Sequence, residues 1–238
     1  MNKKLEISFI LPCLNESESI PIVTTQIQKF INKHNLKAEI ILVDNGSTDD
    51  SVLVAWNYGL RVIKEPKKGY GYALRRGIKK ARGKYLVFGD CDGSYNFYEL
   101  DNQLKYLRKD FDAVLGNRFR GSVEKGAWSF SHRYIGVPFL SLVGRLVYKC
   151  DVFDFHCGME AFNTKFIKSL KLHAKGFEAS TEIIGETCRN TDNYIQVPVN
   201  LHKDKRKTTS SHISTINDGF RHLIFMLKAR RYNYKKVK

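Results

Sequence analysis

Two carboxylates separated by a single residue, Asp90 and Asp92, are the side chains of this sequence best suited to carry chemistry. Asp90 closes the run 84–90 (Lys-Tyr-Leu-Val-Phe-Gly-Asp), which predicts a buried strand ending in a turn, and Asp92 follows in that turn. Carboxylate oxygens are hard ligands suited to Mg²⁺ or Mn²⁺. A cation held by one or two carboxylates takes its other ligands from water and phosphate oxygens, so the pattern predicts a nucleoside diphosphate. Asp-x-Asp recurs in many loops, and its place at the end of a buried strand gives it weight.

Two further polar clusters follow predicted strands. The segment 12–16 (Pro-Cys-Leu-Asn-Glu) ends the first strand and 44–49 (Asp-Asn-Gly-Ser-Thr-Asp) ends the second. Each cluster alone is typical of a turn. Ligands of parallel α/β sheets bind beyond the carboxyl ends of the strands, so three clusters on successive strands predict one shared site.

The elements that must position these residues are short apolar runs alternating with amphipathic stretches. We expect strands at 7–12, 39–44, 61–65, 84–90 and 111–118, and helices at 17–31, 70–81 and 98–108. Beyond residue 120 we expect a helix at 134–149 despite Pro138, then a strand at 153–162, a helix at 177–189, a strand at 194–202 and a last helix at 214–231. This order predicts an α/β fold, a single Rossmann-like domain whose mostly parallel central sheet is flanked by helices, plus a C-terminal amphipathic helix.

The charge of the chain demands an explanation: 40 Lys and Arg against 24 Asp and Glu give a net charge of +16 over 238 residues. Such an excess indicates an anionic partner, namely a nucleic acid, a phosphorylated substrate or an anionic membrane. A nucleic-acid-binding module is disfavoured because the basic residues concentrate at the carboxyl end and because Asp90 and Asp92 would repel a phosphate backbone. Five cysteines without a CxxC pair, together with the lack of a signal peptide or an 18-residue apolar run, predict a cytoplasmic setting.

The motifs, taken in order, resemble those of family 2 glycosyltransferases with the A-type fold. The first half carries Pro12-x-x-Asn15-Glu16, Asp44-Asn45-Gly-Ser-Thr-Asp49, Lys68-Gly-x-Gly-x-Ala73 and Asp90-x-Asp92. The second half looks like the polyprenyl-phosphate branch, the relatives of dolichyl-phosphate mannose synthase, through Gly116-Asn-Arg-Phe119, His132-Arg-Tyr-Ile-Gly136, Asp154-x-His-Cys-Gly158, Gly176-x-Glu178 and Asp218-Gly-x-Arg-His222.

The resemblance implies a role for each matching position. Residues expected to hold the sugar nucleotide are Pro12, Asn15, Glu16, Asp44, Asn45, Lys68 and Cys91. Asp90 and Asp92 should hold its diphosphate through Mg²⁺ or Mn²⁺, with Asp92 as the more direct ligand and Ser94 where relatives often have glutamine. The residues expected to grip the phosphates of donor and lipid acceptor are Arg118, Arg133 and Arg206, with Ser211 kept from the same loop as Arg206.

The activity implied is a metal-dependent, inverting transfer of a sugar from a UDP- or GDP-sugar to a polyprenyl phosphate of the undecaprenyl or dolichyl type. The catalytic residues would be Asp154, Asp92 and Arg118, and the buried Asp154 would either pair with an arginine or face the sugar. A lipid-linked oligosaccharide or another glycan acceptor of cell-envelope polysaccharide synthesis remains the alternative. A non-catalytic relative is disfavoured by the retained carboxylates.

The carboxyl end suggests how the chain reaches a lipid. An apolar stripe lies on one face of the last predicted helix: Ile213, Ile216, Phe220, Leu223, Ile224 and Leu227. Six of the eleven residues in 228–238 are basic. The stripe would either lie on an anionic membrane or pack on the sheet. We therefore expect a catalytic domain at 1–212, a basic amphipathic helix and tail at 213–238, and a peripheral position on the cytoplasmic face of the membrane.

Overall fold

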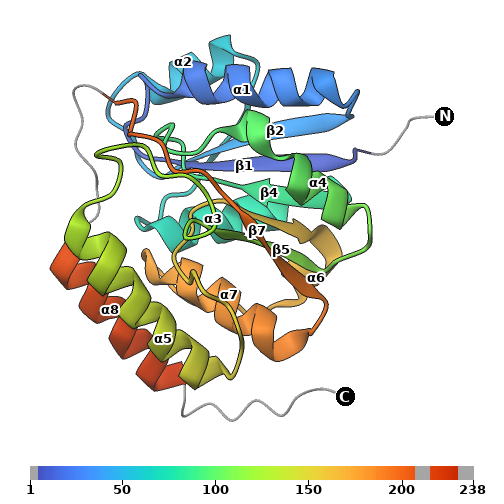
Figure 1. The fold of residues 1–238 in the computed structure, drawn as a ribbon. Helices are drawn as coiled ribbons and strands as arrows, with labels where there is room; N and C mark the ends of the chain where they lie inside the picture. The colour runs from blue at the N-terminus through green and yellow to red at the C-terminus, as the bar shows by residue number, and fades with distance from the viewer. Residues whose placement is uncertain (1–4, 207–214, 230–238) are drawn as a thin grey trace.

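The computed structural model describes residues 5–206 and 215–229, and it shows a seven-stranded sheet between two layers of helices (Figure 1). The strands lie in the order β3-β2-β1-β4-β6-β5-β7. Their bounds are β1 (Ile7–Cys13), β2 (Ala38–Asp44), β3 (Arg61–Lys64), β4 (Tyr85–Phe88), β5 (Ala113–Asn117), β6 (Glu160–Asn163) and β7 (Tyr194–Pro198). The helices are α1 (Ile20–Lys33), α2 (Ser51–Asn57), α3 (Tyr70–Lys80), α4 (Asp101–Leu107), α5 (Val137–Tyr148), α6 (Thr164–Ser169), α7 (Glu178–Asn190) and α8 (Thr215–Ala229), with the short turns η1 (Phe97–Glu99) and η2 (His132–Gly136).

The sheet is mixed, because β6 runs antiparallel between β4 and β5 while the other neighbouring strands are parallel. The predicted α/β fold with a mostly parallel sheet is therefore confirmed. In the register of β1 and β2, Cys13 lies opposite Asp44. The loops that follow these two strands consequently leave the sheet side by side, as the polar clusters require.

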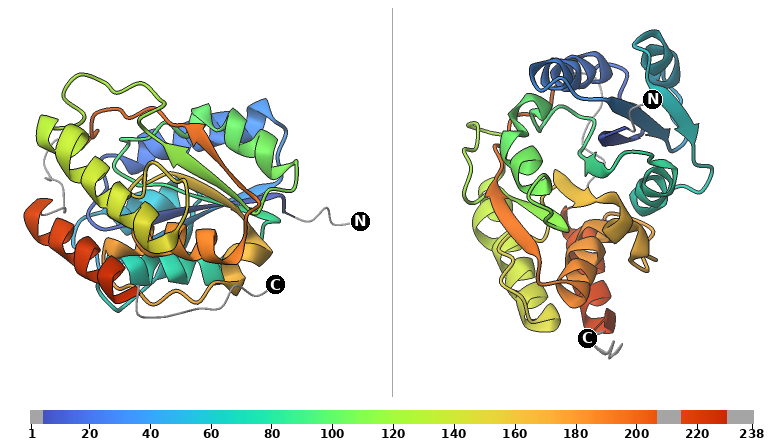
Figure 2. Two further views of the ribbon diagram at one scale, coloured as in Figure 1. Left: turned by 60° about the horizontal axis from the view of Figure 1, so that its bottom comes forward. Right: turned by 90° about the vertical axis from the view of Figure 1, so that its right-hand side faces the viewer.

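Each face of the sheet has its own hydrophobic core. On one face, Phe9 and Leu11 of β1 pack with the apolar sides of α1, α2 and α4. On the other face, Ile10 of β1 packs with α3, α6 and α7. Successive residues of a strand point to opposite faces, so the unbroken apolar run of β1 serves both cores. The right-hand view of Figure 2 shows the two helical layers.

The structure departs from the expected elements at three places. The strand expected at 153–162 is only β6, because the preceding residues form a loop in which Asp154 turns to Arg118 and Gly158 packs on Asp90. The short helix α6 was not predicted. The helix expected at 98–108 is split into η1 and α4. Pro138 is the second residue of α5 and directly follows the π-helical turn η2, a departure from α-helical geometry of the kind that accommodates a proline within a helical run.

Helices α5 and α8 lie side by side, and both contact α7 (Figures 1 and 2). Their amino-terminal ends lie at the edge of the sheet where the parallel strands end (Figure 1). In the part of the chain that the structure describes, no helix has the length and apolar character needed to cross a bilayer.

Candidate active site

The polar residues after β1 and β2 form one set of interlocked loops at the carboxyl edge of the sheet. Asn15 Oδ1 accepts a hydrogen bond from the backbone N of Thr48 (2.8 Å), and the backbone N of Glu16 donates to Ser51 Oγ (2.8 Å). Asn15 has a φ of 57°, the left-handed region that Asn tolerates better than most residues. Asp44 is buried and accepts from the backbone N of Ser47 through Oδ1 (2.9 Å). The two loops are thus fixed to each other before any ligand binds.

Asn45 fastens a third loop to this pair. Its amide Nδ2 donates to the carbonyls of Glu65 (3.1 Å) and Lys67 (2.8 Å), and its Oδ1 accepts from the backbone N of Gly69 (2.7 Å). All of these partners are main-chain atoms, so Asn45 acts here by shaping the loop. Lys68, which the loop carries, is exposed and passes over Gly46.

Asp90 and Asp92 lie beside these loops at the end of β4. The Tyr70 hydroxyl donates to Asp90 Oδ1 (3.2 Å), and a Cβ at Gly158 would overlap Asp90 Oδ2. Burial, with a smaller contribution from the charge of Asp92, raises the pKa of Asp90 to about 7. Asp92 Oδ1 accepts from the backbone N of Ser94 (2.9 Å).

This carboxylate pair fits a hard divalent cation. The charge of Asp92 contributes to the raised pKa of Asp90, and a cation between two adjacent carboxylates stabilises both as anions. Among the residues that the structure describes, no cluster of three or more His, Cys, Asp or Glu side chains is arranged to hold a metal ion. A site of two carboxylates leaves the other coordination positions of such a cation to further ligands, of the kind that water and phosphate oxygens provide.

Residues 201–206 cross this site. The backbone N of His202 donates to the carbonyl of Ser94 (2.8 Å), and that of Lys205 donates to the carbonyl of Asp92 (2.9 Å). This pairing brings the guanidinium of Arg206 to Glu16 (Nη1 to Oε1, 3.0 Å) and within 3.9 Å of Asp92 Oδ2.

The Arg206 side chain is only 4% exposed, and it also bonds Asp204 (Nε to Oδ1, 3.0 Å). Burial raises the pKa of Glu16 to about 8, while the charge of Arg206 lowers it. Arg206 therefore lies among the carboxylates of the site. Ser211, predicted from the same loop, lies outside the described residues.

A second arginine, Arg118 at the end of β5, forms a buried bidentate pair with Asp154. Its Nε bonds Oδ2 (2.7 Å), its Nη2 bonds Oδ1 (2.8 Å), and the indole of Trp128 covers the guanidinium at 4.4 Å. Asp154 is fully buried, so of the two alternatives left open for it the structure shows the pairing with an arginine. The third arginine, Arg133, is half-buried in η2 and packs on Tyr134.

The remaining two predicted residues have buried side chains. Pro12 lies within β1, and the free thiol of Cys91 is buried in the core cluster that also contains Cys13. A contact of Cys91 with substrate would therefore use its main chain.

Several residues that shape the site were missed by the sequence analysis: Tyr70 on Asp90, Tyr95 whose hydroxyl accepts from the backbone N of Gly158, Trp128 on Arg118, and Asp204 on Arg206. Their partners are distant in sequence or belong to a loop without periodicity. The one available signal was aromatic and acidic residues inside otherwise polar loops.

Comparison with known proteins agrees with this geometry. The hexosyltransferase Agl6 of low-salt glycan biosynthesis in Haloferax volcanii is 29% identical over 222 residues, covering 93% of this chain and 53% of Agl6. The chain thus spans about half the length of that relative. The dolichyl-phosphate beta-glucosyltransferase of Saccharomyces cerevisiae is 24% identical, covering 85% of this chain and 68% of the yeast protein.

The fold has solved counterparts. Glucosyl-3-phosphoglycerate synthase from Mycobacterium tuberculosis, solved with Mn²⁺ and UDP-glucose, superimposes with a TM-score of 0.71 and 21% identity over 95% of this chain and 79% of that one. At this identity the similarity establishes the A-type glycosyltransferase fold. Glycosyl transferase family 2 matches residues 8–171, more than half of the chain. The predicted family is therefore confirmed: this chain belongs to glycosyl transferase family 2.

Proposed function

We propose that this glycosyltransferase moves a hexose from a UDP- or GDP-sugar to a polyprenyl phosphate at the surface of an anionic membrane. The main observation in favour of a lipid acceptor is that α5 and α8 present an exposed apolar face. The matching yeast relative, named for its dolichyl-phosphate acceptor, supports the same choice.

The donor would bind at the loops after β1, β2 and β4. In this proposal Asn15, Glu16 and Asp44, with Pro12, surround the base and ribose, and the loop held by Asn45 presents Lys68 to the diphosphate. Asp90 and Asp92 hold the diphosphate through Mg²⁺ or Mn²⁺, which when bound would offset the charge developing on the leaving nucleoside diphosphate.

The acceptor phosphate would meet the arginines. Two guanidinium nitrogens of Arg118 are engaged by Asp154, and Nη1 makes no hydrogen bond within the described residues. Asp154 therefore holds that nitrogen in place for an anion, since guanidinium groups bind phosphate oxygens well. Arg206 and Arg133 would also bind the acceptor phosphate. A phosphate acceptor is already anionic near pH 7, so attack on the anomeric carbon needs little help from a base.

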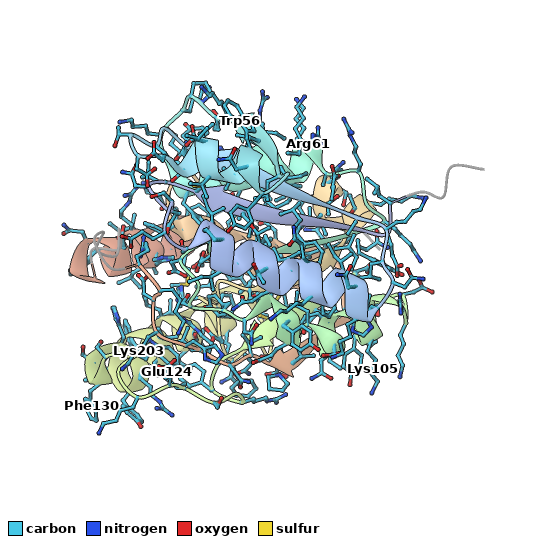
Figure 3. All side chains as sticks on the ribbon, turned by 90° about the horizontal axis from the view of Figure 1, so that it is seen from above. Trp56, Arg61, Lys105, Glu124, Phe130 and Lys203 are labelled. Carbon is cyan, nitrogen blue, oxygen red and sulfur yellow. The ribbon has the colours of Figure 1, made fainter. Side chains whose placement is uncertain are left out.

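The apolar face consists of two stripes, defined here as the lipid-facing stripes. On η2 and α5 the stripe is Ile135 (64% exposed), Phe139 (53%), Leu142 (51%) and Leu146 (71%); on α8 it is Phe220 (61%), Ile224 (49%) and Leu227 (51%). Phe130, 74% exposed, projects from the same end of the molecule (Figure 3). Contiguous exposed apolar residues on neighbouring helices are typical of an interaction surface.

Basic residues flank the lipid-facing stripes, which selects an anionic lipid surface as the partner. Arg133 and Arg145 lie on η2 and α5, Lys149 follows α5, and Lys228 lies near the end of α8. An apolar stripe bordered by basic side chains is the pattern of a helix lying in a membrane interface. Of the two alternatives for the stripe of α8, a membrane or the sheet, the exposure of Phe220, Ile224 and Leu227 favours the membrane. The residues of α8 on the protein side are Asp218, His222 and Met226. The predicted tail and Ile213 lie outside the described residues.

The division into a catalytic domain (1–212) and a membrane-binding helix and tail (213–238) belongs to this proposal. So does a position on the cytoplasmic face, for which five free thiols argue.

Incubation with undecaprenyl phosphate, a panel of UDP- and GDP-sugars, and Mg²⁺ or Mn²⁺ tests the reaction. We expect a glycolipid detectable by mass spectrometry, and none when EDTA is present. Undiminished turnover in EDTA would contradict the metal-dependent scheme. Transfer to a lipid-linked oligosaccharide, with none to the lipid phosphate, would favour the alternative acceptor.

Flotation with vesicles of phosphatidylglycerol and phosphatidylcholine tests the membrane surface. We expect the wild type to float at low salt and Phe139→Ser to float less. Leu53→Ser is the matched control, because Leu53 is equally exposed (53%) but lies on α2, outside the lipid-facing stripes. Equal loss in both variants, or no flotation of the wild type, would contradict the proposal.

A further inference from the structure

Two histidines, His222 and His156, connect α8 to the loop before β6 that carries Asp154. His222 of α8 is 8% exposed, and its ring meets that of His156 edge to face, with centroids 4.6 Å apart at 87°. The Nδ1 of His222 lies 2.7 Å from the hydroxyl of Thr181, a fully buried residue of α7. The proposed reaction uses none of these three side chains.

The other end of this connection is the Arg118–Asp154 pair. The backbone N of His156 donates to Asp154 Oδ1 (3.1 Å), the same oxygen that accepts from Arg118 Nη2. Asp154 Oδ2 is held by the Nε and the backbone N of Arg118. Any shift of His156 therefore moves one of the anchors of the carboxylate that holds Arg118.

Helix α8 presents opposite faces to lipid and to this connection. Phe220, Ile224 and Leu227 are exposed, whereas Asp218, His222 and Met226, spaced by four residues, are buried. An α-helix moves as a rigid rod over this length. When the outer face is drawn into a bilayer, the inner face that carries His222 must move with it.

The contacts of His156 and His222 leave room for a second arrangement of these side chains. Nε2 of His156 is buried and has no hydrogen-bond partner among the described residues. An unsatisfied buried polar atom is costly, so a small shift that gives this nitrogen a partner is favoured. Burial lowers the pKa of His222 to about 4 and holds that of His156 well below its ordinary value. Both rings are thus neutral near pH 7 and remain in contact without repulsion.

We propose that His222 is a positioning residue through which docking of α8 on a lipid surface sets the geometry of the Arg118–Asp154 pair. This inference rests on the proposed function, because it takes the lipid-facing stripes as the docking surface and Arg118 as the phosphate-binding group. Its consequence is that membrane binding raises kcat, beyond delivering the acceptor.

Trp128 offers a readout that does not depend on activity, because its ring lies on the guanidinium of Arg118. The chain has two tryptophans, and the other, Trp56, lies on α2, on the opposite side of the molecule from Phe130 (Figure 3). In a Trp56→Phe background, emission therefore reports on Trp128 alone. We expect phosphatidylglycerol–phosphatidylcholine vesicles to change this emission, and to raise kcat for a water-soluble short-chain prenyl phosphate about fivefold or more.

In the same background, His222→Ala should float with vesicles like its parent but lose both the emission change and the rise in kcat. Thr181→Val keeps the side-chain volume, removes the bond to His222, and should weaken both responses, which provides the test if His222→Ala does not fold. Retention of the emission change in variants that still float would overturn the inference, since Trp128 would then respond to lipid by another route. Absence of vesicle binding by the parent would overturn it too.

The two proposals fail separately. If no sugar is transferred to any prenyl phosphate, but the Trp128 response depends on His222, the proposed function fails and the coupling stands. If transfer occurs with equal vesicle stimulation in the parent and in His222→Ala, the coupling fails and the function stands.

Discussion

The two halves of this chain hold their polar side chains in different ways. From β1 to β4, Asn15, Asp44 and Asn45 bond backbone N–H and carbonyl groups of neighbouring loops. From β5 to α8, the important contacts join side chains to side chains: Arg118 to Asp154, and His222 to Thr181. The first half is therefore a rigid set of loops, whereas the second depends on charged and aromatic pairs that a single substitution can break.

This difference predicts where substitutions cost stability. Asp154→Ala leaves the buried guanidinium of Arg118 without its counter-ion, and we expect the free energy of unfolding to fall by about 3–5 kcal/mol. Urea unfolding followed by circular dichroism measures it. The double variant Asp154→Ala/Arg118→Met should recover part of the loss, because no unpaired charge remains. A loss below about 1 kcal/mol in the single variant would show that the pair is not a major constraint.

The amino-terminal half should respond through activity with little change in stability. Asp92 is 21% exposed on its side chain and bonds the turn that follows it through Oδ1. We expect Asp92→Asn to lower kcat by about 10²–10³-fold, because the leaving diphosphate loses its anchor. The neighbouring Asp50→Asn is the control, since Asp50 is exposed and its side chain makes no capping bond to α2. Equal activity of the two variants would remove Asp92 from the site.

The same contrast decides what could be predicted from sequence. The strands β1, β2 and β4 and the polar clusters after them were predicted within a few residues, because each depends on local periodicity and turn chemistry. The pair of Arg118 with Asp154 spans 36 positions and that of Glu16 with Arg206 spans 190. Nothing in local spacing determines which of the many charged residues meet across such distances.

Helix α8 shows, within one element, what the sequence could and could not predict. Its 3.6-residue periodicity predicted an apolar stripe but left two possible surfaces for it, membrane or sheet. The structure buries Asp218 and His222 instead, since Thr181 and Arg221 provide their polar partners. Burial of the polar face depends on α7, which lies more than 25 positions earlier in the chain.

Measuring the free energy of unfolding as a function of pH tests the burial of His222 on α8. The pKa of His222 is lowered to about 4 chiefly by burial, with a small contribution from Arg221. Glu178 and Asp218 oppose this shift, and His156 packs against the ring. Between pH 6.5 and pH 4, His222 is protonated in the unfolded chain but neutral in the folded chain. The free energy of unfolding therefore decreases as the pH falls toward 4, by about 3 kcal/mol in total. The difference in unfolding free energy between wild type and His222→Gln should therefore shrink or reverse over that range. Parallel curves would contradict the burial of a neutral ring.

The smallest effect on stability is expected on the outer face of α5. Leu146 is 71% exposed and Tyr148 only 6%, although they lie two positions apart on one helix. We expect Leu146→Ser to change the free energy of unfolding by less than about 0.5 kcal/mol, whereas Tyr148→Ala, which empties a contact with Gly185 and Phe155, should cost about 3–5 kcal/mol.

Vesicle binding should rank the two α5 variants in the opposite order. Leu146→Ser removes one apolar side chain from the lipid-facing stripes and should weaken binding roughly tenfold, as expected for a leucine that leaves water only on docking. Tyr148→Ala, if folded at the assay temperature, should bind as wild type. A stable Leu146→Ser protein with unchanged binding would mean that the exposed face of α5 serves another partner. The carboxyl-terminal half would then hold its acceptor through the arginines alone.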